Sequence, residues 1–438
     1  MENKETPQIP TSKIKRASRF VKTGFKVGGN YVKHYSKKLL EPELERETLD
    51  QANAEDIYDT LSELKGSALK VAQMLSMDKG ALPAAFAEKF AEAQHKAPAM
   101  SGPLVNQTFR KYLGKAPHEL YDEFEAQATH AASIGQVHKA YKDGQPLAVK
   151  IQYPGVKESV VSDLNIVRPF ARRLLGFKDQ DIELYFQEVK ERLIEETDYE
   201  LELKRGSWIG GQCSQLENLY FPTYFPELSG AKVISMSWME GLHLDDFMAT
   251  NPSQEVLNKI GQALWDFYNF QVHELKVMHA DAHPGNYLFL PEGEVVVLDF
   301  GCVKEIPEDF YDFYLGMIQP GVVDDEERFT ELCYQAEIIF ESDSEADKEM
   351  YKEILRSALD LLCKPFHAET FDFGDKAYFD GIYEYGEEMA KKPELRQSKV
   401  PRGSKDAIYL NRTYFGLYSI LHELKAEVQT RRFMPILG

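Results

Sequence analysis

The sequence is poor in cysteine and has no long apolar run. Its four cysteines, Cys213, Cys302, Cys333 and Cys363, are scattered and form no C-x-x-C pair, so neither a zinc knuckle nor a disulfide framework is indicated. No segment reaches the roughly 18 to 20 uninterrupted apolar residues that span a bilayer, and the N-terminus lacks the apolar core of a secretory signal. These absences favour a reducing, cytoplasmic location, with any membrane contact made peripherally on the inner face.

Positive charge is also scarce. The chain has 51 Lys and Arg against 71 Asp and Glu, a net charge of -20. Proteins that bind nucleic acid need a basic surface that neutralises phosphates, so the composition excludes nucleic acid as a general partner. The basic residues gather in residues 1–40, which hold ten Lys and Arg and two Glu, a net +8.

The basic N-terminal segment mixes its charges with aromatic and aliphatic residues. Residues 13–40 contain Phe20, Phe25, Tyr31 and Tyr35 among lysines and arginines, a pattern typical of a basic amphipathic helix. Its apolar side could pack on the rest of the protein. Alternatively, it could contact an anionic or prenyl-lipid membrane surface or a protein partner, including a second copy of the chain.

With 438 residues, 43% of them hydrophobic, the chain is long enough for two lobes. We expect four parts: a basic, partly disordered or amphipathic segment at 1–50, a helical extension at 51–102, a small mixed lobe at 103–240, and a helical large lobe at 241–438. Helices are predicted at 104–113, 181–205, 253–275, 308–319, 324–340, 347–362 and 409–432, and a strand at 232–239.

A hairpin is predicted in the small lobe. Two apolar arms, 128–140 and 146–151, flank the turn Lys142-Asp143-Gly144, and Asp-Gly between such arms is a strong hairpin signal. The second arm carries Lys150. A turn rich in small residues precedes the first arm, so backbone N–H groups and the Lys150 ammonium could reach the same phosphates. A glutamate on the following helix should hold the lysine, and both Glu196 and Glu202 are candidates.

The most specific pattern lies between residues 279 and 301. It contains Asp281, Asn286 and Asp299, at the spacing found in kinase-type active sites. In such a site the first carboxylate orients an acceptor hydroxyl or water. The amide and the second carboxylate would then hold Mg²⁺ or Mn²⁺ on a polyphosphate. This spacing predicts a kinase-type phosphotransferase centre, against the alternative of a hairpin with three incidental polar residues.

Two histidines lie in the same stretch. His279 is expected to support the loop through packing and a backbone hydrogen bond rather than to act as a base. His283 lies beside Asp281 and could suggest a zinc site, but the sequence offers no third and fourth ligand at zinc-like spacing.

Several motifs in series resemble the UbiB (AarF/ADCK) family of atypical kinases, over roughly residues 55 to 305. They are Lys70-Val71-Ala72-Gln73, the runs 131–138 and 148–156, Glu196-Thr197-Asp198, and the loop 279–286. The resemblance implies an α+β, protein-kinase-like two-lobed fold. It also implies an N-terminal helical extension with a K-x-G-Q motif and a mostly helical C-terminal lobe.

The resemblance also implies roles for individual residues. Lys150 would bind the phosphates of ATP or ADP, with Glu202 as its partner and Asp281 as the residue that orients the acceptor. An alanine-rich loop and the crossover between lobes would supply further nucleotide contacts, namely Ala131, Ala132, Ser133, Ile134, Gly135, Gln136, Met239 and Glu240. A lid would form from Lys70 paired with Glu196, completed by Gln73 and Asp198.

The sequence departs from the family pattern at several points. Ala72 replaces the glycine of the K-x-G-Q motif, and Thr129-His130 begin the alanine-rich loop, so the lid position and the nucleotide preference could differ. No Ala-Pro-Glu motif follows Gly301, which disfavours phosphorylation of protein substrates.

The leading hypothesis is an atypical kinase or ATPase that binds Mg-ATP or ADP in an inter-lobe cleft. It would support isoprenoid quinone or prenyl-lipid metabolism at a membrane surface. The alternatives are a small-molecule kinase with a diffusible acceptor and a nucleotide-binding, pseudokinase-like scaffold. The presence of Lys150, Asp281, Asn286 and Asp299 favours an enzyme.

Overall fold

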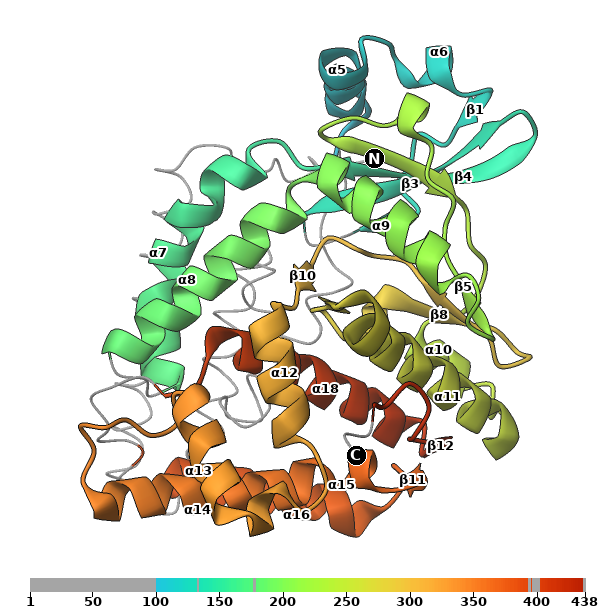
Figure 1. Cartoon of the computed structure of the whole chain (residues 1–438). Coiled ribbons are helices and arrows are strands. Elements are labelled where there is room, and N and C mark those ends of the chain that lie inside the picture. The colour runs from blue at the N-terminus through green and yellow to red at the C-terminus, as the bar shows by residue number, and fades with distance from the viewer. Residues whose placement is uncertain (1–99, 132–133, 176–178, 393–394, 396–401, 436–438) are drawn as a thin grey trace, which may run out of the picture. The chain divides into compact units, whose positions relative to one another are not determined.

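The computed structural model describes residues 100–131, 134–175, 179–392, 395 and 402–435 (Figure 1). The contacts divide the chain into two units. The first takes in the described residues before Arg205 together with Thr223–Trp238, and the second takes in Arg205–Pro222 and the described residues from Met239 onward. The predicted amphipathic segment and helical extension, with Lys70 and Gln73, lie outside the described residues.

The first unit contains an antiparallel sheet in the order β1-β3-β4-β6, with β2 also paired to β3. Its strands are β1 (Glu123–Phe124), β2 (His130–Ala131), β3 (Gly135–Lys142), β4 (Gln145–Gln152) and β6 (Val233–Ser237). Strand β4 is buried at every position from Leu147 onward, so both of its faces are covered. Helices α5 (Gly102–Leu113) and α6 (Pro117–Leu120) precede the sheet.

The predicted hairpin is confirmed as β3 and β4. Asp143 and Gly144 connect the two strands with φ angles of 50° and 75°. Two successive positive φ angles twist the turn in the direction that the strands require, and Asp-Gly adopts them at low cost.

Three helices follow β4: α7 (Val156–Leu175), α8 (Asp179–Glu196) and α9 (Tyr199–Cys213). Helices α7 and α8 pack side by side (Figure 1), and α7 was not anticipated. The single helix predicted at 181–205 was wrong, because the chain breaks at Thr197-Asp198. The Thr197 hydroxyl donates to the Ile194 carbonyl at 2.6 Å, and Asp198 Oδ1 accepts the Leu201 N–H at 3.0 Å. Asp198 therefore ends one helix and caps the next.

The second unit is mainly helical and includes three small sheets, β5-β9-β8, β10-β7 and β11-β12. Its helices are α10 (Leu244–Met248), α11 (Gln254–Phe270), α12 (Glu308–Met317), α13 (Glu326–Gln335), α14 (Glu345–Leu362), α15 (Lys364–His367), α16 (Lys376–Lys391) and α18 (Lys405–Glu423). Its strands are β5 (Leu219–Tyr220), β7 (Val277–His279), β8 (Tyr287–Phe289), β9 (Val295–Val297), β10 (Val303–Glu305), β11 (Thr370–Asp372) and β12 (Glu427–Gln429).

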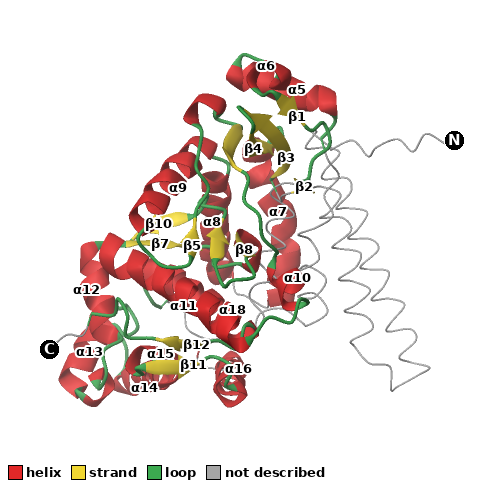
Figure 2. Ribbon diagram, turned by 90° about the vertical axis from the view of Figure 1, so that its right-hand side faces the viewer, coloured by secondary structure: helices red, strands yellow, loops and turns green. Residues whose placement is uncertain are grey.

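Several of these helices begin at a short polar side chain. Such a side chain accepts a hydrogen bond from a backbone N–H that has no partner within the helix. The capping residues include Ser253, Asp325, Ser344 and Ser404. Helix α11 lies at the centre of the unit, with Trp265, Phe267 and Tyr268 fully buried, and it runs beside α18 (Figure 2). After Phe270 the chain continues as a π-helix, Gln271–Leu275.

Two helix ends differ from the prediction. The helix predicted to reach residue 432 ends at Glu423, because Lys425 takes a φ of 50° and the Ala426 N–H bonds back to the Leu421 carbonyl. That left-handed stop directs the chain into β12, which pairs with β11. The helix predicted at 324–340 occupies Glu326–Gln335, and Glu337 follows it with a φ of 58°. Helix α16 was not predicted.

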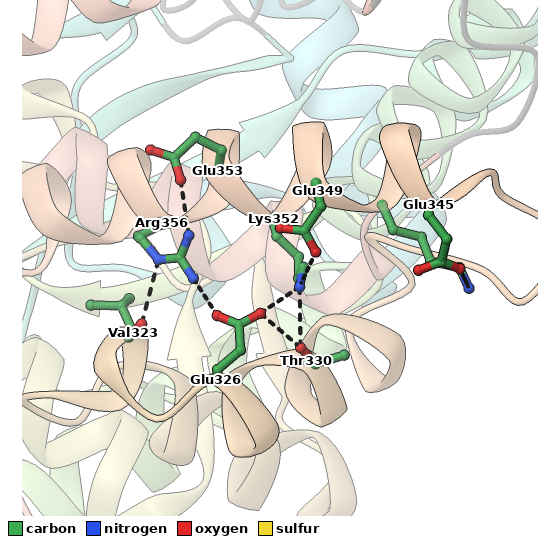
Figure 3. A network of polar contacts seen from close by, with 9 residues as sticks. Val323, Glu326, Thr330, Glu345, Glu349, Lys352, Glu353 and Arg356 are labelled. Carbon is green, nitrogen blue, oxygen red and sulfur yellow. Dashed lines mark hydrogen bonds and ion pairs between the residues drawn. The ribbon is translucent and has the colours of Figure 1, made fainter.

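An ionic network joins α13 to α14 (Figure 3). Glu326 on α13 contacts Lys352 Nζ at 2.5 Å and Arg356 Nη2 at 2.8 Å, both from α14. The side chain of Lys352 is only 7% exposed, as expected for a lysine that buries its aliphatic stem and keeps its ammonium in an ion pair. Among the described residues, no helix combines the length and apolar character needed to cross a bilayer.

Candidate active site

A buried ion pair joins the predicted phosphate-binding lysine to α9. Lys150 Nζ on β4 lies 2.8 Å from Glu202 Oε1 and 3.1 Å from Oε2. The side chains are 11% and 1% exposed. Of the two glutamates that the sequence offered, Glu202 makes this pair. The carboxylate fixes the position of the ammonium, the group that would bind phosphate.

Tyr199 packs beside the same lysine and was missed by sequence reasoning. Lys150 Nζ lies 5.2 Å from the centre of the Tyr199 ring, within the range of a cation–π contact. A Cβ atom on Gly135 would lie 2.8 Å from the Tyr199 hydroxyl and 2.5 Å from the Ile151 carbonyl oxygen. Only glycine therefore fits at position 135, and the start of β3 lies directly against Tyr199.

The predicted nucleotide loop is described in part. Ala131 pairs with Gln136 across β2 and β3, and Ile134 is buried. Ala132 and Ser133 lie outside the described residues.

Gln136 has a fully buried side chain that makes internal bonds. Its Oε1 accepts the Met100 N–H at 2.5 Å, and its Nε2 lies 2.6 Å from His138 Nε2. Because His138 Nδ1 faces the Glu125 carbonyl at 2.7 Å, that nitrogen must carry the proton, so Nε2 accepts from Gln136. Burial lowers the pKa of His138, which favours this neutral tautomer. Any contact of Gln136 with a nucleotide would therefore come from its backbone.

Two residues of the predicted lid, Glu196 and Asp198, lie at the break between α8 and α9. Glu196 is buried, whereas Asp198 is exposed and caps α9. The Thr197 carbonyl accepts the Gln152 Nε2–H at 3.0 Å, which connects this segment to the end of β4. Their predicted partners, Lys70 and Gln73, lie outside the described residues, so the lid stays a prediction. Met239 and Glu240, the predicted crossover contacts, directly follow the first unit.

In the second unit, two strand pairs bring Asp281, Asn286 and Asp299 together. Strand β7 pairs with β10, and the Ala280 N–H extends that ladder by donating to the Cys302 carbonyl at 2.9 Å. Strand β8 pairs with β9, and the Leu298 N–H extends it by donating to the Asn286 carbonyl at 2.9 Å. Each predicted residue therefore lies at the end of a ladder that fixes its backbone.

Asn286 orients Asp281. Its Nδ2 donates to the Asp281 carbonyl at 2.9 Å and to Asp281 Oδ2 at 3.1 Å. Since the amide nitrogen makes both bonds, the amide oxygen is the atom that Asn286 can offer to a cation. Asp299 Oδ1 accepts the Gly301 N–H at 2.8 Å, which fixes that carboxylate. A carboxylate and an amide oxygen are ligands that suit Mg²⁺, which keeps several waters or phosphate oxygens as its other ligands.

His279 supports the loop as predicted. It is fully buried, and its Nε2 lies 2.6 Å from the Asp299 carbonyl oxygen, so Nε2 donates. The Phe300 ring packs edge-on against it at 5.6 Å. His283 Nδ1 accepts the Gly285 N–H at 3.0 Å. No group of three or more His, Cys, Asp or Glu side chains in the described part of the chain is arranged to hold a metal.

A buried pair of tyrosines lies near Asp281 and was not identified from the sequence. The hydroxyls of Tyr268 on α11 and Tyr287 lie 2.5 Å apart. Burial raises the pKa of both phenols well above the usual value, and the charge of Asp281 raises both further. They therefore stay protonated beside the Asp281 carboxylate. The position of Tyr287 directly after Asn286 was the signal available in the sequence.

The chain is similar to known proteins in sequence and in overall fold. A family profile described as the ABC1 atypical kinase-like domain matches residues 92–333. Atypical kinase COQ8B, mitochondrial, from Danio rerio is 27% identical over 97% of this chain and 68% of its own length. AarF domain-containing protein kinase 1 from Xenopus laevis is 30% identical over 60% of this chain and 52% of its own length.

A solved structure, the complex of Rv3197 with erythromycin from Mycobacterium tuberculosis, is similar with a TM-score of 0.58 and 25% identity. The match covers 91% of this chain and 96% of that one. The protein-kinase-like fold predicted from the sequence is thereby confirmed. Since the profile spans more than half of the sequence, this chain belongs to the ABC1 atypical kinase-like family, the UbiB (AarF/ADCK) group that its motifs resemble.

Proposed function

We propose that the protein is a Mg²⁺-dependent ATPase or phosphotransferase. The observation that carries the proposal is the arrangement of the catalytic loop, in which Asn286 Nδ2 holds both the backbone and the carboxylate of Asp281. A scaffold would not need a carboxylate fixed in this way, whereas an acceptor-orienting group does.

Each residue has a task in this chemistry. Lys150, held by Glu202, binds phosphate oxygens of ATP. Asp281 accepts a hydrogen bond from the attacking hydroxyl or water and takes up its proton as the new bond to the γ-phosphorus forms. The bond from that phosphorus to the β–γ bridging oxygen breaks at the same time, and ADP leaves with the electron pair. Mg²⁺, with Asn286 and Asp299 among its ligands, would neutralise the phosphate charge.

We further propose that this activity supports isoprenoid quinone or prenyl-lipid metabolism at a membrane surface. The family membership and the mitochondrial COQ8B relative support the quinone link. The net +8 of residues 1–40 supports contact with an anionic surface. The basic segment would bring the catalytic unit to a lipid-borne acceptor.

Nucleotide hydrolysis by purified protein, with and without anionic liposomes, tests the catalytic proposal. Asp299→Asn is the matched control, because the amide keeps the size of the side chain but removes its charge. Wild-type protein should hydrolyse ATP faster than this variant. Equal rates under both conditions would reject the enzyme and favour a nucleotide-binding scaffold.

Lipid and metabolite profiles of cells that carry wild-type or Asp299→Asn protein test the proposed pathway. A quinone precursor or prenyl lipid that accumulates only in the variant strain would support it. Identical prenyl-lipid profiles, with active wild-type enzyme in vitro, would redirect the search toward a diffusible acceptor.

A further inference from the structure

Helix α18 approaches the catalytic loop at Gly416. A Cβ atom built on Gly416 would lie 2.7 Å from the Ala282 carbonyl oxygen and 2.9 Å from the Ala282 Cβ. Real Cβ atoms do not come this close to backbone oxygen, so any other residue at 416 would displace one of the two segments. Ala282 lies between Asp281 and His283, inside the loop that carries the proposed chemistry.

The backbone conformation at position 416 does not require glycine. Gly416 lies in the interior of α18, and it is not among the glycines with positive φ. Glycine inside a helix costs about 1 kcal/mol relative to alanine. A helix with no other constraint would therefore be more stable with alanine here, and the close approach to Ala282 is the constraint that the structure shows.

Helix α18 is also held in place next to this contact. The Thr413 hydroxyl lies 3.8 Å from Met278 Sδ on β7, and the Tyr414 hydroxyl donates to Asn269 Oδ1 on α11 at 3.0 Å. Leu417 is fully buried. Since α18 packs along α11 (Figure 2), an added side chain at 416 would move the loop more readily than the helix.

We propose that Gly416 is a positioning residue for the catalytic loop. Its missing side chain lets α18 support the backbone of Ala282, and that support sets the position of the neighbouring Asp281. The support comes from a part of the chain that lies beyond residues 92–333, which the family profile matches. The effect on turnover rests on the proposed function, whereas the effect on loop geometry does not.

The expected displacement follows from the distances. Ordinary van der Waals contact begins at 3.4 Å, so a Cβ at 416 requires Ala282 to move by about 0.7 Å from its oxygen contact at 2.7 Å. A shift of about 1 Å in a catalytic group can cost about 100-fold in rate. We therefore expect Gly416→Ala to lower kcat about 10-fold or more, while the KM for ATP changes less than 3-fold, because Lys150 and Glu202 lie on other elements.

The matched control is Gly386→Ala. Gly386 lies on α16, and a Cβ there meets nothing within 4 Å, so this variant should keep the wild-type kcat. A double variant, Gly416→Ala with Ala282→Gly, removes the Cβ–Cβ contact and should recover part of the lost turnover relative to Gly416→Ala. If Gly416→Ala does not fold, the double variant is compared with Ala282→Gly alone, and it should still be slower because the contact with the carbonyl oxygen remains.

Hydrogen exchange of the loop supplies a readout that does not depend on activity. The amides of Ala280, His283 and Asn286 all donate backbone hydrogen bonds, and their exchange should be at least 10-fold faster in Gly416→Ala than in Gly386→Ala. Unchanged loop exchange together with unchanged kcat would overturn the proposal. Wild-type hydrolysis no faster than that of Asp299→Asn would instead reject the proposed function, and loop exchange would still decide the role of Gly416.

Discussion

At the scale of single residues, Lys150 and Glu202 place opposite charges where water hardly reaches them. Taking two ions out of water is costly, and their mutual attraction offsets that cost only while both are present. An apolar pair of similar size could fill the same space, so stability alone does not require these two charges, in agreement with the proposed role of Lys150 in phosphate binding.

Lys150→Met should lower the free energy of unfolding by about 3 to 5 kcal/mol, because it leaves a buried carboxylate without its ammonium partner. The double variant with Glu202→Leu should recover most of this loss but should still not bind nucleotide. Chemical denaturation and nucleotide titration measure the two effects. A single variant as stable as wild type would show that Glu202 does not depend on Lys150.

Asp266 on α11 is a second buried charge, outside the proposed site. It accepts one hydrogen bond, from Gln262 Nε2 at 2.9 Å, and pairs with Arg432 at 2.8 Å. Burial raises the pKa of Asp266 to about 6 from a usual 3.8, and these two partners offset that shift only in part. The folded state therefore binds the Asp266 proton more tightly than the unfolded state does.

It follows that this carboxyl stabilises the fold most below about pH 4, and that the contribution is lost as the pH rises toward 6. Relative to Asp266→Asn, the wild-type protein should lose about 2 to 3 kcal/mol of unfolding free energy between pH 4 and pH 7. Denaturant titrations of both proteins across this range measure the difference. Parallel curves would mean that Asp266 ionises normally in the folded protein.

At the scale of elements, the break between α8 and α9 places Glu202 in the first turn of α9. Asp198 caps that turn. Asp198→Ala should destabilise the protein by about 1 kcal/mol and weaken nucleotide binding, because Glu202 and hence Lys150 lose their support. Asp198→Asn should keep both properties, since asparagine caps as well as aspartate.

Thermal denaturation and nucleotide affinity of the two Asp198 variants separate capping from a role of the charge. If Asp198→Asn keeps stability but loses nucleotide-dependent activity, the carboxylate acts in the predicted lid rather than as a cap.

Local sequence predicted the elements whose signals are local. Asp143-Gly144 specified the turn between β3 and β4. The ends of α13 and α18 were missed, because Glu337 and Lys425 take positive φ without being glycine. Glutamate and lysine do not by themselves predict the end of a helix. At Lys425 the chain leaves α18 for β12, and the pairing of β12 with β11 depends on residues far away in the sequence.

At the scale of the whole molecule, the predicted site residues Asp281, Asn286 and Asp299 come together because the motif spacing reflects two short antiparallel ladders, β7 with β10 and β8 with β9. Tyr199 and Gly416 were not predicted, because no motif contains them. Their roles depend on contacts with Gly135 and Ala282, and no sequence pattern relates residues so far apart. Sequence thus identifies the groups that do chemistry more readily than the groups that position them.

The uneven charge of the chain gives a prediction at the same scale. Deleting residues 1–40 removes a net +8 from a protein of net -20, so the truncated protein should bind anionic liposomes much more weakly. Wild-type binding should also weaken as salt rises, because salt screens surface charge. Flotation with vesicles of graded anionic lipid content measures both. Undiminished flotation of the truncated protein would place the membrane contact elsewhere.

We propose that Asn286 and Asp299 hold a divalent ion on the nucleotide whose phosphates Lys150 binds. Electron paramagnetic resonance of Mn²⁺, which can replace Mg²⁺, tests it directly. We predict that the wild-type protein binds Mn²⁺ tightly only when ATP or ADP is present, and that Asp299→Asn and Lys150→Met lose this nucleotide-dependent binding. Mn²⁺ binding that is independent of nucleotide, or equal in Asp299→Asn and wild type, would contradict the account.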